Sequence, residues 1–204
     1  MFLFDIETHP ESQIFLVGIS LGASILTRYL GEEGSNSKVQ AAGAVCCPYS
    51  VPLSCHYLHK GVGLIYCKVL AGHLLKKYET WAYDIENIDS DLSGRMLKAI
   101  KTAKTIRDID ELICAREFGY SNVDDFWEGT SPEPFIEKVK TPTLFLSTRD
   151  DPIINKVVIP YKEMEKNPNT CLAVTKAGGH VGFIDIMGNQ WHPKPLLEFF
   201  KHFR

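Results

Sequence analysis

The sequence predicts an α/β fold in which helices cover a doubly wound, mostly parallel β-sheet. Three observations predict it. They are short apolar runs, helical patterns that follow several of these runs, and one long, mostly helical stretch between the second run and the third. Apolar runs without polar alternation are typical of strands buried on both faces of a parallel sheet. We expect such strands at Ile14–Val17, Ala41–Cys47, Thr143–Leu146 and Cys171–Val174.

Amphipathic patterns follow several of these runs and predict the covering helices. One helix is expected over Leu21–Leu30, with Gly31 as its stop. A second is expected over Lys156–Lys166, and a closing helix follows Pro195. The apolar stripe of the first helix comprises Ile25, Leu26, Tyr29 and Leu30, and that of the closing helix comprises Leu196, Leu197, Phe199, Phe200 and Phe203.

A long stretch between the second and third runs has a different pattern. It is mostly helical at first, with apolar residues at Leu58, Val62, Ile65 and Val69, and becomes polar and charged after Tyr83. We interpret about residues 52–128 as a helical cap inserted over the sheet. Residues 1–204 then form one partial domain, because a chain of this length is too short to argue for two.

Composition excludes some classes of function. A net charge of −3 leaves no basic field for a phosphate backbone, so no nucleic-acid partner is expected. The N-terminal residues Met1–Asp5 lack the charged and apolar regions of a signal peptide. No apolar run reaches the ~20 residues that cross a bilayer. The nearest candidate, Gly61–Gly72, is interrupted by Lys68, so peripheral membrane contact is the most that this segment allows.

The six cysteines predict neither a disulfide framework nor a metal site. The group Cys46-Cys47 with Cys55-His56 lacks the paired spacing of tetrahedral zinc ligands. Buried, reduced thiols are the simpler interpretation, which favours a reducing, cytosol-facing compartment. We expect no metal and no cofactor.

The motif Gly18-Ile19-Ser20-Leu21-Gly22 carries the main functional signal. It lies between a predicted strand and a predicted helix, the context in which G-x-S-x-G forms a nucleophile elbow. The residues two positions from Ser20 must then be small to avoid clashes. Ser20 is the expected nucleophile, and the backbone N–H of Leu21 at the helix start is an expected oxyanion donor.

A serine nucleophile needs a base and an acid that orients the base. Asp150-Asp151-Pro152 follows the third apolar run and Gly178-Gly179-His180 follows the fourth. Because parallel strands end at one edge of a sheet, Ser20, Asp151 and His180 are expected to meet there. Asp151 is the expected acid, with Asp150 as the alternative. Alone, each pattern has an ordinary explanation, a turn at the aspartates and a loop histidine at His180.

These residues resemble the α/β-hydrolase-domain 1/2/3 family (YheT-like, AB hydrolase 4), which includes plant embryogenesis-associated relatives. The resemblance implies an α/β-hydrolase fold and a Ser20–Asp151–His180 triad. It also implies a serine ester hydrolase of the carboxylesterase, acylglycerol lipase or phospholipase type, acting on lipid or short-to-medium acyl esters. Many members are membrane-anchored. The blocks that carry the resemblance are Val17–Gly22, Tyr29–Gly34, Phe118–Tyr120, Asp124–Trp127, Ser131–Pro132, Pro142–Leu144, Asp150–Pro152 and Gly178–Phe183.

The sequence departs from the family pattern at its start. Only twelve residues precede a first strand taken from Gln13 to Val17, so we expect an N-terminally truncated member without the loop that supplies the second oxyanion N–H. Ile14–Val17 would then form an apolar sheet edge. Two alternatives stay open: a catalytically impaired isoform that acts as a binding protein, and an alcohol acyltransferase that shares the acyl-enzyme.

Overall fold

The computed structural model describes residues 11–204, and the N-terminal residues Met1–Asp5 considered above lie outside that range. The chain forms two compact units. The first comprises residues 11–49, 132–151 and 159–204, and the second comprises Ser50–Ser131 and Pro152–Val158. Each unit has its own hydrophobic core. Whether the second unit caps the sheet, as expected for about residues 52–128, stays a prediction.

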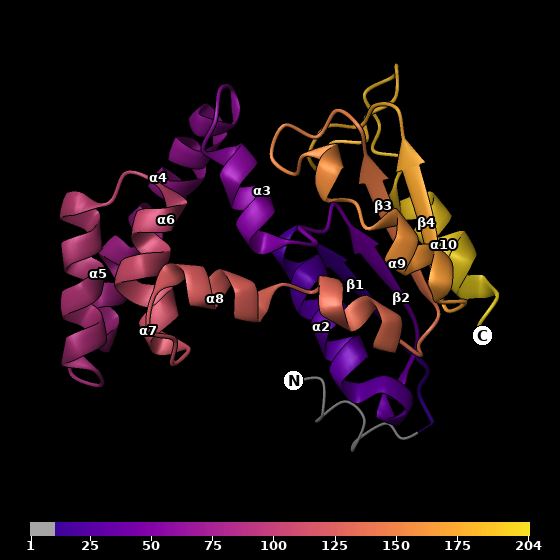
Figure 1. Ribbon diagram of the computed structural model, residues 1–204, viewed down its shortest axis with the longest axis horizontal. Coiled ribbons are helices and arrows are strands. Elements are labelled where there is room, and N and C mark those ends of the chain that lie inside the picture. Colours follow the sequence, from indigo (N-terminus) through magenta and orange to yellow (C-terminus); the bar gives the residue numbers. More distant parts are fainter. Residues whose placement is uncertain (1–10) are drawn as a thin grey trace. The chain divides into compact units, whose positions relative to one another are not determined.

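The first unit contains a parallel sheet with the strand order β1-β2-β3-β4 (Figure 1). Its strands are β1 Ile14–Ile19, β2 Val39–Val45, β3 Thr143–Thr148 and β4 Thr170–Thr175. All four strands were predicted from the apolar runs. Every residue of β3 is buried, whereas β4 is only partly buried and its Cys171 is exposed. The expectation that the cysteines are buried is therefore wrong for Cys171, which lies on the last strand of the sheet in the described residues, and Cys114 is only half-buried.

Helices cover both faces of this sheet, as the α/β prediction requires. On one face, α2 (Leu21–Glu33) buries Leu26 and Leu30 against Val39, Ala42 and Val139. On the other face, α10 (Pro193–Lys201) buries Leu196 against Val45, Leu144 and Leu146. Gly43 lets α10 approach, because a Cβ there would lie 2.5 Å from Leu196 Cδ2. The remaining elements of this unit are η1 (Gly34–Asn36), η3 (Glu133–Lys138) and α9 (Tyr161–Lys166).

Two expected helix boundaries are wrong. Helix α2 runs through Gly31 and ends at Gly34, which has a φ of 51°. Gly31 is instead a packing position, since a Cβ there would lie 2.5 Å from the Phe135 carbonyl oxygen. The helix expected over Lys156–Lys166 is divided into η4 (Lys156–Val158) and α9, with Pro160 preceding the latter. Ile25, expected on the apolar stripe of α2, is 63% exposed.

The second unit is helical, and its core lies between two long helices and the segment that follows them. Its helices are α3 Val51–Leu58, α4 Gly63–Ile85, α5 Ser90–Thr102, α6 Ile106–Ile109, the π-helical η2 Asp110–Cys114, α7 Ala115–Glu117 and α8 Val123–Thr130. Ala71, Tyr78 and Ala82 of α4 pack against Met96 and Ala99 of α5. The Trp127 indole donates a hydrogen bond of 2.8 Å to the half-buried Asp110.

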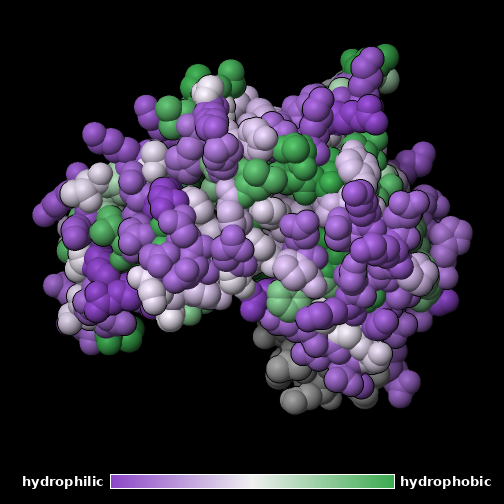
Figure 2. Space-filling model, in the orientation of Figure 1, coloured by the Kyte–Doolittle hydropathy of each residue, from purple (hydrophilic) through white to green (hydrophobic). Residues whose placement is uncertain are grey.

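The face of the molecule seen in Figure 2 is mostly hydrophilic, with patches of hydrophobic side chains. Several large apolar side chains are exposed, including Val17 and Ile19 on β1 and Ile65 and Val69 on α4. Within residues 11–204, no helix combines the length and apolarity needed to cross a membrane.

Candidate active site

Ser20 lies on a sharp turn between β1 and α2. Its φ is 53°, a left-handed conformation that is uncommon for residues other than glycine. The turn is tight because the backbone of Gly18 passes close to the first turn of α2. A Cβ on Gly18 would lie 2.4 Å from the carbonyl oxygen of Gly22 and 2.7 Å from Ala23 Cα. Gly18 is therefore required by sterics, as the motif predicted.

The same prediction is wrong for Gly22. A Cβ built at Gly22 meets nothing within 4 Å. Leu21 is the first residue of α2, where backbone N–H groups have no partner inside the helix. An N–H group in this position, at the positive end of the helix dipole, suits an anionic oxygen.

The loop that carries His180 follows β4. It has several residues with positive φ angles and is anchored by the buried ring of Phe183. Gly179, Val181 and Phe183 have positive φ angles of 61°, 65° and 45°. The Phe183 side chain is fully buried beside Val45 and Leu196. The Phe183 N–H also donates a hydrogen bond of 2.8 Å to the Gly178 carbonyl, which closes the loop.

The three predicted side chains meet at the carboxyl edge of the sheet. His180 Nδ1 lies 2.9 Å from Asp151 Oδ2, and His180 Nε2 lies 2.9 Å from Ser20 Oγ. The Asp151 side chain is 2% exposed and that of His180 is 15% exposed. An ionised carboxylate only accepts hydrogen bonds, so Nδ1 donates to Asp151 and Nε2 is left to accept from the Ser20 hydroxyl.

Asp150 lies in a different environment from Asp151. Its Oδ1 accepts a hydrogen bond of 2.9 Å from the Gly179 N–H. That N–H holds the pKa of the Asp150 carboxyl below its usual range. The structure thus brings Asp151 to the imidazole, and Asp150 to the backbone of the loop that holds it.

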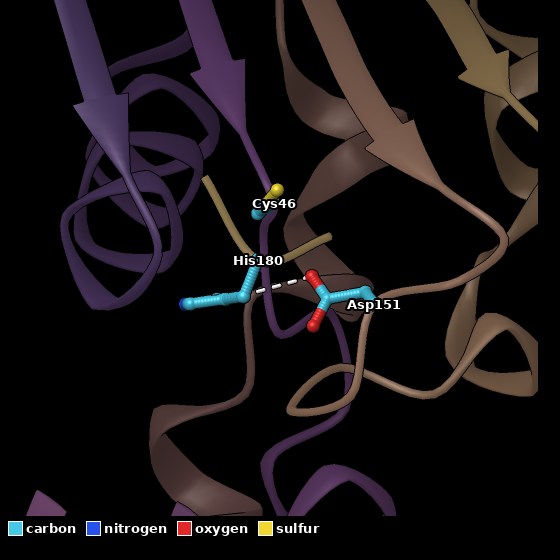
Figure 3. A group of neighbouring side chains, drawn as sticks. All are labelled: Cys46, Asp151 and His180. Atoms are coloured by element: carbon cyan, nitrogen blue, oxygen red, sulfur yellow. Dashed lines mark hydrogen bonds and ion pairs between the residues drawn. The ribbon is translucent and has the colours of Figure 1, made fainter. Parts of the chain in front are cut away.

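Cys46 lies beside Asp151 and His180, and no motif in the sequence predicted it there (Figure 3). It directly follows β2 with a φ of 50°, and its Sγ lies 4.0 Å from the Gly179 carbonyl oxygen. Its position at the carboxyl end of an apolar run was the available signal. Burial raises the pKa of the Cys46 thiol to about 12, so it is protonated at neutral pH.

Cys46, Asp151 and His180 together have the donor atoms of a metal site. One potential ligand atom from each lies within 4.8 Å of the others. Both imidazole nitrogens, however, are already held by Asp151 and Ser20. A metal ion would have to displace these hydrogen bonds, so the arrangement fits proton transfer better than metal coordination.

Curated proteins with similar sequences cover most of this chain. A monoacylglycerol lipase of Saccharomyces cerevisiae is 32% identical, over 95% of this chain and 43% of the relative. An abhydrolase domain-containing protein of Dictyostelium discoideum is 33% identical, over 93% of this chain and 47% of the relative. The chain thus spans less than half the length of these two relatives. No family model matches it.

Solved structures share the fold. An esterase of Pyrococcus furiosus aligns with a TM-score of 0.53 at 19% identity, over 99% of this chain and 58% of that structure. This likeness concerns the fold alone, and it agrees with the parallel sheet and its covering helices. A partial α/β-hydrolase fold, with a parallel sheet and covering helices, is therefore confirmed. The sequence matches, to a monoacylglycerol lipase and an abhydrolase domain-containing protein over almost the whole of this chain, agree with the α/β-hydrolase-domain family that its motif blocks predicted.

Proposed function

We propose that this chain carries the catalytic residues of a serine ester hydrolase acting on lipid or acyl esters. The observation that supports it best is the continuous hydrogen-bonded path from Asp151 through His180 to Ser20. The three residues come from three separate loops at one sheet edge, so the path is a product of the fold. The names of the similar lipase and abhydrolase proteins support the same class of chemistry.

The proposed reaction follows from the geometry. The Ser20 hydroxyl attacks the acyl carbonyl carbon while His180 Nε2 takes the hydroxyl proton. Asp151 orients the imidazole through Nδ1 and stabilises the imidazolium that forms. The Leu21 N–H donates to the oxyanion of the tetrahedral intermediate. His180 then gives its proton to the departing alkoxide, which leaves an acyl group on Ser20. A water molecule attacks this acyl carbonyl while His180 takes a proton from the water. His180 then returns the proton to Ser20 Oγ as the free acid departs.

A fluorophosphonate probe tests the nucleophile. The probe phosphonylates a serine only when a neighbouring base activates it. We expect labelling of the wild-type chain, none of Ser20→Ala, and strongly slowed labelling of His180→Gln. A matched control is Ser24→Ala, which removes another serine of the same helix. Labelling that persists in Ser20→Ala would contradict the proposal.

Product analysis separates hydrolysis from acyl transfer. An acyl-enzyme that reacts with water gives a free acid, whereas one that reacts with an added alcohol gives a new ester. We expect the acid to dominate in water. Absence of both products from a folded chain that is also unlabelled would favour the non-catalytic alternative. Peripheral membrane contact and the identity of the acyl group stay predictions.

A further inference from the structure

Helix α4 presents an apolar face that its own unit does not cover. Val62, which directly precedes α4, is 65% exposed, and Ile65 and Val69 are 63% and 50% exposed; Tyr66 and Leu70 are also exposed. Positions 62, 65, 66 and 69 have the spacing of one helix face. The sequence predicted a helix from this pattern, but an apolar stripe at that spacing normally faces a core. Here it faces outward.

The opposite side of α4 is fully used for packing within the second unit. Gly63, Cys67, Ala71 and Tyr78 are buried along it. Gly63 allows close contact with α3, since a Cβ there would lie 2.7 Å from the Tyr57 carbonyl oxygen. Cys67 Sγ lies 3.5 Å from His59 Nε2. Rotation of the helix to bury the apolar face would break this packing, so the exposure is built into the unit.

The charged residues of the segment that carries this face have one sign. From His59 to Tyr78 the sequence has four lysines and no aspartate or glutamate, although the whole chain has a net charge of −3. All four lysines are exposed: Lys60, Lys68, Lys76 and Lys77. An exposed apolar helix face flanked by lysines is the arrangement by which helices lie in the interface of an anionic lipid layer.

We propose that the apolar face of α4, with its flanking lysines, docks this protein on an anionic lipid surface. Val62, Ile65, Tyr66 and Val69 enter the interface, and the lysines contact lipid phosphates and carboxylates. The charge pattern favours lipid over a second copy of the chain, because two such faces would bring their lysines together. The proposal is independent of the role of Ser20, since docking requires no catalysis.

Vesicle co-sedimentation without substrate tests the proposal. The probe is phosphatidylcholine vesicles with about 30% phosphatidylserine, compared with phosphatidylcholine alone, at low and physiological salt. We expect binding to the anionic vesicles that weakens as salt rises. Equal binding to both vesicle types, or no binding to either, would overturn the proposal.

Two pairs of variants locate the surface. Lys68→Gln with Lys76→Gln is expected to weaken binding by about fivefold per lysine. The matched control, Lys98→Gln with Lys101→Gln, removes two exposed lysines of α5 and is expected to change binding less than about twofold. Equal effects of the two pairs would show that only net charge matters and would overturn the assignment to α4.

The apolar contribution needs its own variant. Ile65→Gln with Val69→Gln is expected to weaken vesicle binding by about tenfold or more, because both side chains would leave the lipid. Ile88→Gln, at an 85% exposed position beyond α4, is the control. A dimer in sedimentation analysis that only the Ile65/Val69 variant dissociates, without vesicle binding, would show that a second copy covers the face. Circular dichroism checks that each variant is folded.

Discussion

Ser20 and Cys46 both have positive φ angles, and each directly follows the end of a strand at the carboxyl edge of the sheet. Non-glycine residues in this conformation are strained and persist where the surrounding structure fixes them. Ser20 is held by a hydrogen bond of 2.8 Å from its N–H to the Val45 carbonyl, and Cys46 by one of 2.8 Å to the Leu146 carbonyl. This backbone conformation places Ser20 Oγ within hydrogen-bond distance of His180 and places the Cys46 thiol beside the loop that carries His180.

The two adjacent aspartates give a matched test at the residue scale. Asp151→Asn would present an amide to His180 Nδ1 and disturb the tautomer, so we expect kcat/KM for an ester to fall on the order of 10⁴-fold, as in serine proteases. Asp150→Asn keeps an oxygen that accepts from the Gly179 N–H, so a loss of about tenfold or less is expected. The reverse order would identify Asp150 as the acid.

His192 predicts a pH dependence of stability. It is buried, its Nδ1 has no hydrogen-bond partner among the described residues, and burial lowers its pKa below 6.5. The unfolded state therefore binds a proton more readily than the folded state as pH falls below about 6.5. The free energy of unfolding is therefore higher above about pH 6.5, where His192 is neutral in both states, and it falls as the pH drops below that value.

Urea denaturation at pH 7 and pH 5 measures this effect. We expect the free energy of unfolding to fall less between these pH values in His192→Gln than in the wild type. The exposed His202→Gln serves as the control. Equal losses in all three proteins would show that other groups cause the pH dependence.

At the scale of elements, the connection between β1 and α2 depends on Gly18 but not on Gly22. Gly18→Ala would force its Cβ into the Gly22 carbonyl oxygen, and overpacking of this kind costs about 1–3 kcal/mol. Gly22→Ala places a methyl group in open space within α2. It should leave stability unchanged or raise it by about 0.5 kcal/mol, because alanine favours helix.

Urea denaturation and fluorophosphonate labelling of both variants check this prediction. Gly18→Ala is expected to lose stability and labelling together, since the elbow orients Ser20. A destabilised Gly22→Ala would mean that the turn is tighter than the structure shows. If Gly22→Ala is stable but unlabelled, the glycine serves the approach of the substrate.

At the scale of the whole molecule, β1 is an edge strand within the described residues, because it pairs only with β2. Val17 and Ile19 on this strand are 48% and 43% exposed. The sequence predicted this apolar edge, and such edges promote association between chains. Val17→Lys should therefore reduce association at high concentration, measured by light scattering. Ile25→Lys changes an exposed apolar residue of helix α2 and should have less effect.

Much of the site could be predicted because its signals are local. Apolar runs located the four strands, and each predicted functional residue follows the end of a strand. The same local patterns failed where packing between distant segments decides. Gly31 reads as a helix stop, yet it lies inside α2 because the Phe135 backbone approaches there. The stripe on α4 reads as a core face, yet Gly63 and Cys67 on the other side are the buried ones.

The sequence alone determined the α/β class, the order of Ser20, Asp151 and His180 along the chain, and the resemblance to the α/β-hydrolase-domain family. These depend on hydrophobic periodicity and on motif spacing, which are visible in the order of the residues along the chain. Only the tertiary structure decided which aspartate contacts the imidazole, and that Cys46 lies beside it. Asp150 and Asp151 are adjacent and chemically identical, so their roles differ only through the direction in which the end of β3 presents each side chain. In the loop from Gly178 to Phe183, the Gly179 N–H donates a hydrogen bond to Asp150, and the His180 imidazole contacts Asp151.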